Sequence, residues 1–335
     1  MSDSLSRAAS SSNTPNLDKF SVNMSKKASN GAYSPAIGRE KEVDKIIKSL
    51  SRKNKPNVVL VGPFGVGKTA IAEHLALMSV SGELPPKLQD IQIHELVLTD
   101  LISGSAFRGQ FEKRIKDVIE EVKNNKNIVL FIDEIHTIMG LGSVGGGTMD
   151  ASNILKPALA RGEIRVIGAT TTKEYKELEN DGAFKRRFIK VNVDEPSAED
   201  TLDILRKSKG AYEKFHNMDI SDEILQSIVK YSRMYINDRF SPDREFDILD
   251  LLGASVSVNA EVSSDRKLLT ELKAQKDAAI KEQKYERASE IRDLVINLQK
   301  KVDKDGASTG PRREILMKDL NDVVSELTGI SAGDI

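Results

Sequence analysis

The sequence predicts an α/β fold in which a mostly parallel sheet is followed by an all-helical region. From about residue 37 to residue 195, short apolar runs rich in β-branched residues alternate with helical stretches, which is typical of stacked βαβ units. After Pro196 the strand pattern stops. Between about residues 265 and 304 charged residues are dense and apolar residues recur every three or four positions, which indicates an amphipathic helix or helical hairpin.

The composition excludes several classes of protein. The chain has 335 residues, no cysteine, four histidines and a net charge of -1. The lack of cysteine excludes disulfides and thiolate metal sites, and the histidines form no pair at ligand spacing. Because nucleic-acid binders usually carry a basic excess, the balanced charge argues against a broad nucleic-acid surface, although a narrow basic channel stays open. We expect no nucleic-acid partner.

No membrane or secretion signal is evident. No apolar stretch approaches the roughly 18 to 20 residues that span a bilayer, and the first 31 residues lack the apolar segment of a secretory signal. The first dozen residues are rich in serine, which predicts a mobile tail; the alternative is the start of an organellar transit peptide. We expect no membrane partner and a cytoplasmic location.

The predicted sheet consists of apolar runs with helices between them. Clear strands are expected at 57–61, 128–132, 164–169 and 188–193, with a weaker one near 93–98. The helices between them are expected at 68–78, 111–124 and 150–160.

Helices replace strands after Pro196. Ser197 followed by Asp200 is typical of a capped helix start, and further helices are expected at 221–235, 242–256 and 314–327. The charged region is expected to break near 282–284. Its apolar stripe consists of Tyr285, Ala288, Ile291, Val295, Leu298 and Val302. This stripe either packs within its own hairpin or binds a partner.

A glycine-rich segment, GPFGVGKT (62–69), follows a predicted strand and opens a helix. Its glycines let backbone N–H groups and the helix N-terminus point at phosphate oxygens. Lys68 suits the β and γ phosphates, and the Thr69 hydroxyl suits Mg²⁺. The sequence therefore predicts a P-loop; the alternative is a turn that only starts a helix. The expected nucleotide-binding residues are Gly62, Pro63, Gly65, Val66, Gly67, Lys68 and Thr69.

Two acids, Asp133 and Glu134, end another apolar strand. Parallel strands present their carboxyl ends to the ligand crevice, where Asp133 would hold Mg²⁺ and Glu134 would activate the attacking water. Alone, two acids after a strand are more often a solvated strand end. Together with the P-loop, they predict a nucleoside triphosphatase.

Hydroxyl and arginine side chains give weaker signals. Thr171 follows a third strand, where it can contact a γ phosphate or a water, although threonine is also ordinary turn chemistry there. Arg186 and Arg187 precede the last strand of the sheet. Paired arginines are usually surface ion pairs; the functional interpretation is an arginine finger that reaches a nucleotide on a neighbouring subunit.

Two loops complete the set. SAFRGQ (105–110) places Phe107 among small and polar residues, and GLGSVGGG (140–147) follows the strand that carries Asp133. An isolated aromatic is more often a core anchor, and a glycine-rich loop is more often a linker.

Through these motifs the sequence resembles the AAA+ ATPases of the Clp family, and within it the first ATPase module of the ClpC and ClpB type. The resemblance runs from TPNLDKF (14–20) to LTGI (327–330) and includes IGRE, FRGQFEKRIK, LFIDEIHT, LKPALARGEIRVIGATT and SPDREFD. KEQKYERASEIRD (281–293) is similar to the ClpC middle domain. The resemblance implies a P-loop AAA+ fold with a three-layer parallel sheet, an all-helical lid subdomain and a helical-hairpin (coiled-coil) insertion.

The resemblance also implies a role for each matching residue. Lys68 and Thr69 match Walker A, and Asp133 and Glu134 match Walker B. Thr171 matches the first sensor, and Arg186 and Arg187 match the arginine fingers. Ile37 and Arg244 match further nucleotide contacts. The substrate pore loop is matched by Phe107, Arg108 and Gly109, and a second pore loop by residues 140–147.

The implied organisation has five parts. We expect a flexible Ser-rich arm at 1–35, the large α/β ATPase subdomain at 36–195, the helical lid at 196–258, the middle-domain hairpin at 259–310, and a C-terminal lid helix and tail at 311–335. Relatives of this type carry a substrate domain before residues 14–20 and a second ATPase module, with the protease-docking loop, after residues 327–330. The resemblance therefore predicts a single-ring form and gives no support for coupling to a peptidase. Residues 245–255 of the lid depart from the family pattern.

The leading hypothesis is an ATP- and Mg²⁺-dependent protein unfoldase that forms a homohexameric ring and threads unfolded or tagged polypeptides. The alternative is a regulatory or assembly subunit that joins a longer Clp ring, or binds adaptors through the 265–304 hairpin. A nucleic-acid motor or clamp loader shares the AAA+ core, but the FRG loop argues against it.

Overall fold

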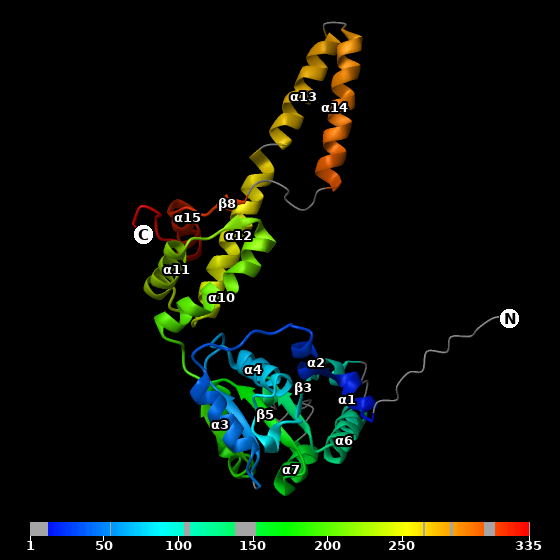
Figure 1. Ribbon diagram of the computed structural model, residues 1–335, viewed down its shortest axis with the longest axis vertical. Coiled ribbons are helices and arrows are strands. Elements are labelled where there is room, and N and C mark those ends of the chain that lie inside the picture. The colour runs from blue at the N-terminus through cyan, green and yellow to red at the C-terminus, as the bar shows by residue number, and fades with distance from the viewer. Residues whose placement is uncertain are drawn as a thin grey trace, which may run out of the picture. The chain divides into compact units, whose positions relative to one another are not determined.

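The chain divides after Pro196 into two compact units, Met1–Pro196 and Ser197–Ile335 (Figure 1). A computed structural model describes residues 13–53, 55–103, 108–137, 152–263, 265–281, 284–304 and 312–334.

A six-stranded sheet forms the centre of the first unit. Its strand order is β1-β3-β4-β5-β2-β6, and every neighbouring pair is parallel except the edge pair of β1 with β3. The strands are β1 (Ser21–Asn23), β2 (Asn57–Val61), β3 (Gln92–Leu96), β4 (Ile128–Ile132), β5 (Arg165–Thr170) and β6 (Phe188–Asn192). All residues of β2 and β4 are buried, and apart from Asn57 all of them are apolar, as expected for parallel strands that are covered on both faces.

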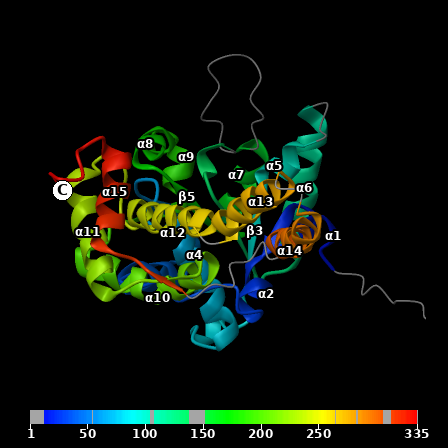
Figure 2. The same cartoon turned by 90° about the horizontal axis from the view of Figure 1, so that it is seen from above.

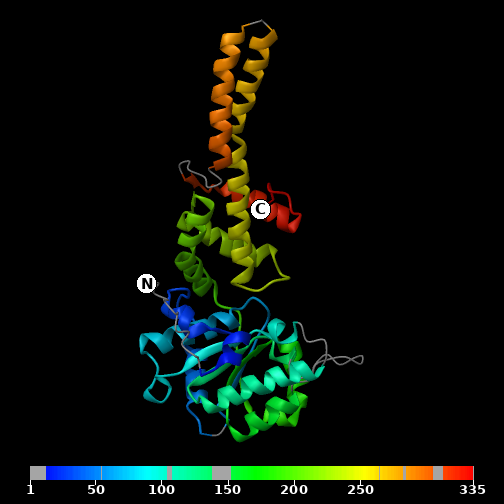
Figure 3. The ribbon, with the colours of Figure 1, turned by 90° about the vertical axis from the view of Figure 1, so that its right-hand side faces the viewer.

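Helices cover both faces of this sheet (Figure 3). Val59 and Val61 of β2 belong to one apolar cluster, and Val58 and Leu60 belong to the other, because side chains alternate along a strand. The first cluster includes α1 (Pro15–Phe20), α5 (Leu98–Ile102), α6 (Arg108–Asn124), α7 (Ser152–Arg161), α8 (Thr172–Asn180) and α9 (Gly182–Lys185). The second includes α2 (Met24–Ser29), α3 (Glu40–Leu50) and α4 (Lys68–Ser81). The predicted three-layer α/β fold is therefore confirmed.

Residues 13–35 differ from the predicted flexible arm. They form α1, β1 and α2, and their side chains Leu17, Phe20 and Met24 are buried. The carboxylate of Glu121 in α6 accepts hydrogen bonds from the backbone N–H groups of Asn16 (3.0 Å) and Leu17 (2.8 Å). An acid at a helix N-terminus stabilises it, so this short helix is held by a partner far away in sequence. Residues 1–12 lie outside the described part of the chain.

The second unit is a helical bundle with its own core. It contains α10 (Ala198–His216), α11 (Asp222–Tyr235), α12 (Asp243–Ser263) and α15 (Met317–Thr328), and α15 packs beside α11 and α12 (Figure 2). Ser197 caps α10, as predicted, by accepting a hydrogen bond from the Asp200 N–H at 3.0 Å. A short parallel ladder that was not predicted joins β7 (Met218–Asp219) to β8 (Arg313–Glu314).

A helical hairpin extends α12 within this unit. Helix α13 (Asp265–Lys281) packs along α14 (Tyr285–Lys304) (Figure 1); residues 282 and 283 of the predicted break lie outside the described residues. Ala288 and Ile291 of the predicted stripe are buried, as is Ala279 of α13. These stripe residues therefore pack within the hairpin. None of the described helices has the length and apolar character needed to cross a membrane.

Candidate phosphate-binding site

The predicted site residues gather at one edge of the sheet of the first unit. The loop 62–67 joins β2 to α4, and Asp133 and Thr171 directly follow β4 and β5. Parallel strands end at the same edge, where open α/β sheets bind ligands. Backbone hydrogen bonds hold the loop there: Gly62 N–H donates to Thr170 O at 3.3 Å, and Val193 N–H donates to Val61 O at 2.8 Å.

Glycines are required in this loop for two different reasons. Gly67, the N-cap of α4, has a φ of 90°, a left-handed conformation that favours glycine. Gly62 is limited by space, because a Cβ atom there would lie 2.1 Å from the backbone oxygen of Val193. The glycine spacing therefore shapes a loop that ends at a helix N-terminus, which is a ready-made site for anions.

Lys68 is buried beside the loop that it follows. Its Nζ donates to the carbonyl oxygens of Gly62 (3.0 Å) and Pro63 (2.6 Å). Burial lowers the pKa of Lys68 below its ordinary value, and the negative charges of Asp133, Glu174 and Glu134 oppose that shift. A cation held in a desolvated position interacts strongly with an incoming anion.

Thr69 and Asp133 come together from different elements. The Thr69 Oγ1 hydroxyl donates to Asp133 Oδ2 at 2.9 Å. A hydroxyl and a carboxylate this close together suit Mg²⁺, which binds few protein ligands and takes its remaining ligands from water and phosphate oxygens. Among the described residues, no cluster of three or more His, Cys, Asp or Glu side chains is placed to hold a metal ion.

Glu134 occupies a strained, exposed turn. Its φ is 47°, which is uncommon for a residue other than glycine and concentrates at functional sites. Its N–H donates to Asp133 Oδ1 at 2.9 Å, and its carbonyl oxygen accepts from Thr137 N–H at 2.8 Å. The turn therefore fixes the two acids relative to each other.

Thr171 and its neighbour Thr170 have different partners. Thr171 is the N-cap of α8, and its side chain accepts a hydrogen bond from the Glu174 N–H at 3.4 Å. The Thr170 hydroxyl lies 3.1 Å from Nδ1 of His136, just after the Asp133 turn. His136 thus connects the end of β5 to the segment that carries Asp133 and Glu134.

Arg186 and Arg187 lie in the turn between α9 and β6. Arg186 is exposed and Arg187 is half-buried. The Arg187 carbonyl oxygen accepts a hydrogen bond from Asn57 Nδ2 at 3.3 Å, while Asn57 Oδ1 accepts from Val166 N–H at 3.0 Å. The fully buried Asn57 therefore ties the arginine turn to the centre of the sheet.

The segment before α3 also reaches the loop. Ile37 is half-buried there, and two residues later the buried Arg39 donates from Nη2 to the Val66 carbonyl oxygen at 2.7 Å. The sequence assigned no role to Arg39, Asn57 or His136, although Arg39 lies within IGRE and His136 within LFIDEIHT, because their partners are distant in the sequence.

Two protein-family descriptions match this chain. The ATPase family associated with various cellular activities (AAA) matches residues 58–193, and the AAA lid domain matches residues 197–295. The chain therefore contains an AAA ATPase domain followed by an AAA lid domain. The described site lies in the AAA domain, which indicates a nucleotide-binding ATPase.

Two relatives show which AAA proteins this chain is similar to. The ATP-binding subunit ClpE of the ATP-dependent Clp protease from Bacillus subtilis is 44% identical over 324 residues, covering 95% of this chain and 46% of ClpE. The ClpC subunit of Staphylococcus aureus is 41% identical over 341 residues, covering 98% of this chain and 42% of ClpC. The chain therefore spans less than half the length of these relatives.

Solved structures give the same relationship for the fold. The Hsp104–ADP complex of Saccharomyces cerevisiae superposes with a TM-score of 0.74 at 34% identity, covering 95% of this chain and 46% of that one. An extended Hsp104–casein complex has a TM-score of 0.67 at 42% identity, covering 73% of this chain and 42% of that one.

Arg244, the predicted nucleotide contact of the AAA lid, is buried within the second unit. Its Nε donates to Glu245 Oε1 at 3.0 Å, its Nη1 to the Ile236 carbonyl oxygen at 2.9 Å, and its Nη2 to Ser241 Oγ at 3.0 Å. These bonds hold the guanidinium inside the lid.

The predicted pore-loop residues are described only in part. Phe107 and residues 140–147 lie outside the described residues. Arg108 is the first residue of α6. Gly109 beside it is exposed.

Proposed function

We propose that this AAA ATPase hydrolyses ATP with Mg²⁺ in a homohexameric ring and uses the energy to unfold and thread polypeptides. One observation carries the proposal: Thr69 Oγ1 lies 2.9 Å from Asp133 Oδ2, and both residues lie beside the glycine-rich loop and the buried Lys68. These groups supply cation-binding and phosphate-binding chemistry at the same edge of the sheet.

In this proposal each described residue has a distinct task. The backbone N–H groups of residues 62–69 and the Lys68 ammonium bind the phosphates, and Thr69 and Asp133 hold Mg²⁺. Bound Mg²⁺ neutralises negative charge on the phosphates. Glu134 takes a proton from the attacking water. The oxygen of that water forms a bond to the γ phosphorus, and the bond between the γ phosphorus and the bridging β-phosphate oxygen breaks. Thr171 orients that water.

The arginine turn serves the neighbouring subunit. We assign Arg186 and Arg187 to stabilise charge on a γ phosphate bound by the next protomer of the ring. The exposure of Arg186 supports this, as does the anchoring of the turn by Asn57. Hydrolysis then depends on assembly.

The threading role is assigned to Phe107, Arg108 and Gly109. An aromatic ring can grip an extended chain by apolar contact without reading its sequence. The two Hsp104 neighbours solved with casein and with ADP support a polypeptide substrate and an adenine nucleotide.

The hairpin is the proposed site for adaptors. Leu268 and Ile280 of α13 and Leu294 of α14 expose 45%, 47% and 55% of their surface. Apolar side chains on a solvated hairpin suit a protein partner.

Hydrolysis and assembly test the proposal directly. We expect wild-type protein to hydrolyse ATP and Glu134→Gln to bind ATP but turn it over at least about 100-fold more slowly. Light scattering with ATP should show a hexamer, which Glu134→Gln preserves. A wild type as inactive as Glu134→Gln under conditions where it assembles would refute the ATPase motor. Failure to form homohexamers, together with binding to a full-length Clp ATPase, would favour the regulatory-subunit alternative.

Threading needs a separate test. Phe107→Ala should retain ATPase activity and lose unfolding of a tagged fluorescent protein, while Phe107→Tyr should retain both. Equal unfolding by the wild type and Phe107→Ala would remove the pore-loop assignment.

A further inference from the structure

We propose that Phe64 is a positioning residue of the phosphate site, whose ring holds the Lys68 ammonium in place before nucleotide arrives. The proposal deepens the proposed function, since the ligand of Lys68 is taken to be ATP. Phe64 lies within the glycine-rich loop and is not among the predicted nucleotide-binding residues.

The geometry places the ring against the cation. Nζ of Lys68 lies 5.6 Å from the centroid of the Phe64 ring, within the roughly 6 Å range of a cation–π interaction. Phe64 exposes 63% of its surface, and it belongs to neither apolar cluster of the first unit. Core packing therefore does not account for its position, whereas the contact with Lys68 does.

The contact leaves Lys68 able to bind phosphate. An ammonium has three N–H donors, and two of them point to the carbonyl oxygens of Gly62 and Pro63. An aromatic face attracts the charge without taking a phosphate oxygen's place. The ring and the two carbonyl groups thus restrict a long, flexible side chain in advance, and such preorganisation lowers the entropic cost of binding.

Affinity for nucleotide is the first measurement. Titration with a fluorescent ATP analogue should show that Phe64→Ala raises Kd about two- to fivefold, the range of an exposed cation–π contact. Phe64→Tyr keeps an aromatic face and should restore the wild-type Kd. Phe64→Leu is apolar without a π face and should behave like Phe64→Ala. In steady-state hydrolysis the change should fall on KM, with kcat at saturating ATP unchanged.

Three results would overturn the proposal. An unchanged or lower Kd in Phe64→Ala would show that the ring does not help Lys68. A wild-type Kd in Phe64→Leu would show that apolar cover alone suffices. The same rise in Phe215→Ala, which removes a side chain of the second unit that is 82% exposed, would show a nonspecific effect.

A spectroscopic test needs neither nucleotide nor turnover. The chain contains no tryptophan, so Phe64→Trp introduces a single reporter at this position. In the nucleotide-free protein, adding Lys68→Met to Phe64→Trp should shift the emission maximum and change quenching by acrylamide, with far-UV circular dichroism unchanged. Identical emission and quenching in the two proteins would refute the contact. Because this result is independent of hydrolysis, it distinguishes failure of the Phe64 proposal from failure of the ATPase proposal.

Discussion

At the scale of single residues, the phosphate site depends on close backbone approach. Gly62 is surrounded by main chain: its hypothetical Cβ would lie 2.1 Å from the Val193 carbonyl oxygen and 3.2 Å from a methyl carbon of Val66. A backbone oxygen cannot rotate away as a side chain can. The loop and the end of β6 must therefore separate to admit any larger residue.

Gly62→Ala should therefore destabilise the protein and disable the loop. We expect a loss of about 3 kcal/mol in the free energy of unfolding, because overpacking at a rigid site has this size, together with loss of nucleotide binding. Gly210→Ala is the matched control: Gly210 lies in α10 with nothing within 4 Å of its Cβ position, so alanine should stabilise that helix by up to about 1 kcal/mol. Urea unfolding of both variants measures the difference, and equal stability would contradict the predicted clash.

Asn57 is a second residue on which the structure around the site depends. It is fully buried, and its amide serves the Val166 N–H and the Arg187 carbonyl oxygen together. Removal of a buried partner leaves a polar group unsatisfied, which is costlier than the loss of the bond itself.

Asn57→Ala should lower the free energy of unfolding by about 1–3 kcal/mol and loosen the arginine turn. Trypsin followed by mass spectrometry should show faster cleavage after Arg186 and Arg187 than in the wild type. Asn192→Ala, at an exposed position of β6, should change neither. Unchanged cleavage in Asn57→Ala would mean that Asn57 does not hold the turn.

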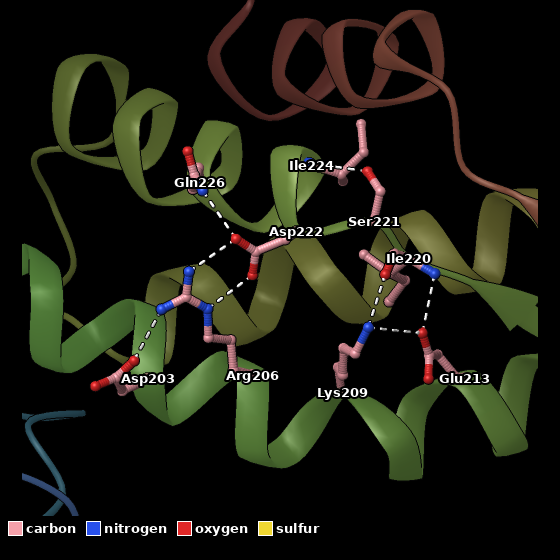
Figure 4. Close-up of polar contacts among 9 residues, drawn as sticks. All are labelled: Asp203, Arg206, Lys209, Glu213, Ile220, Ser221, Asp222, Ile224 and Gln226. Atoms are coloured by element: carbon pink, nitrogen blue, oxygen red, sulfur yellow. Dashed lines mark hydrogen bonds and ion pairs between the residues drawn. The ribbon is translucent and has the colours of Figure 1, made fainter.

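At the scale of elements, charged side chains fix the start of α11 against α10. Figure 4 shows Arg206 forking onto Asp222, the first residue of α11, with Nε to Oδ1 and Nη2 to Oδ2 both at 2.7 Å. Asp203 accepts from Nη1 of the same arginine at 3.0 Å. Two helices that share a bidentate pair resist rotation about their axes, because a fork fixes direction as well as distance.

Arg206→Ala should release this carboxyl group. The hydrogen bond from Arg206, followed by one from Gln226, lowers the pKa of Asp222 from its ordinary 3.8 to about 2. A lowered native pKa adds stability that is fully present above the unfolded value of about 3.8 and is lost as the pH falls through about 2. In Arg206→Ala, the NMR-detected pKa of Asp222 should rise toward 3.8, and the pH dependence of stability in that window should weaken. Lys207→Ala, an exposed neighbour, should leave the Asp222 pKa at about 2.

Local patterns predicted most of the elements, and long-range contacts account for the rest. Strands β2 and β4 have the predicted bounds because each is one continuous buried run. Helices α1 and α2 were missed because each is only six residues long, and α1 is stabilised by Glu121, which is distant in the sequence. The edge strand β1 has three residues and no alternation to recognise. The phosphate loop was predictable for the opposite reason, since its function requires one contiguous set of residues.

At the scale of the whole molecule, the predicted nucleotide residues are divided unequally between the two units. The P-loop, Asp133, Glu134, Thr171 and the arginine turn belong to Met1–Pro196, and Arg244 alone among the predicted contacts belongs to Ser197–Ile335. The lid arginine shares the carboxylate of Glu245 with Ser232 and Ser241, at 2.6 and 2.8 Å. A buried charge pair of this kind is strongly destabilising when one member is removed.

ADP should therefore stabilise the first unit, and Arg244→Ala should weaken the second. A ligand at about 100 times its Kd adds about 2.7 kcal/mol of stability, so hydrogen exchange should slow in β2, the phosphate loop and α4 when ADP is added to the full chain.

Arg244→Ala should speed exchange in α11 and α12, because the Glu245 carboxylate loses its guanidinium, while leaving the ADP-induced protection of the phosphate loop intact. Lys230→Ala, at an exposed position of α11, provides the control for a charge change in the lid. If Arg244→Ala instead abolished the ADP-induced protection, Arg244 would be a nucleotide contact as the family resemblance implies.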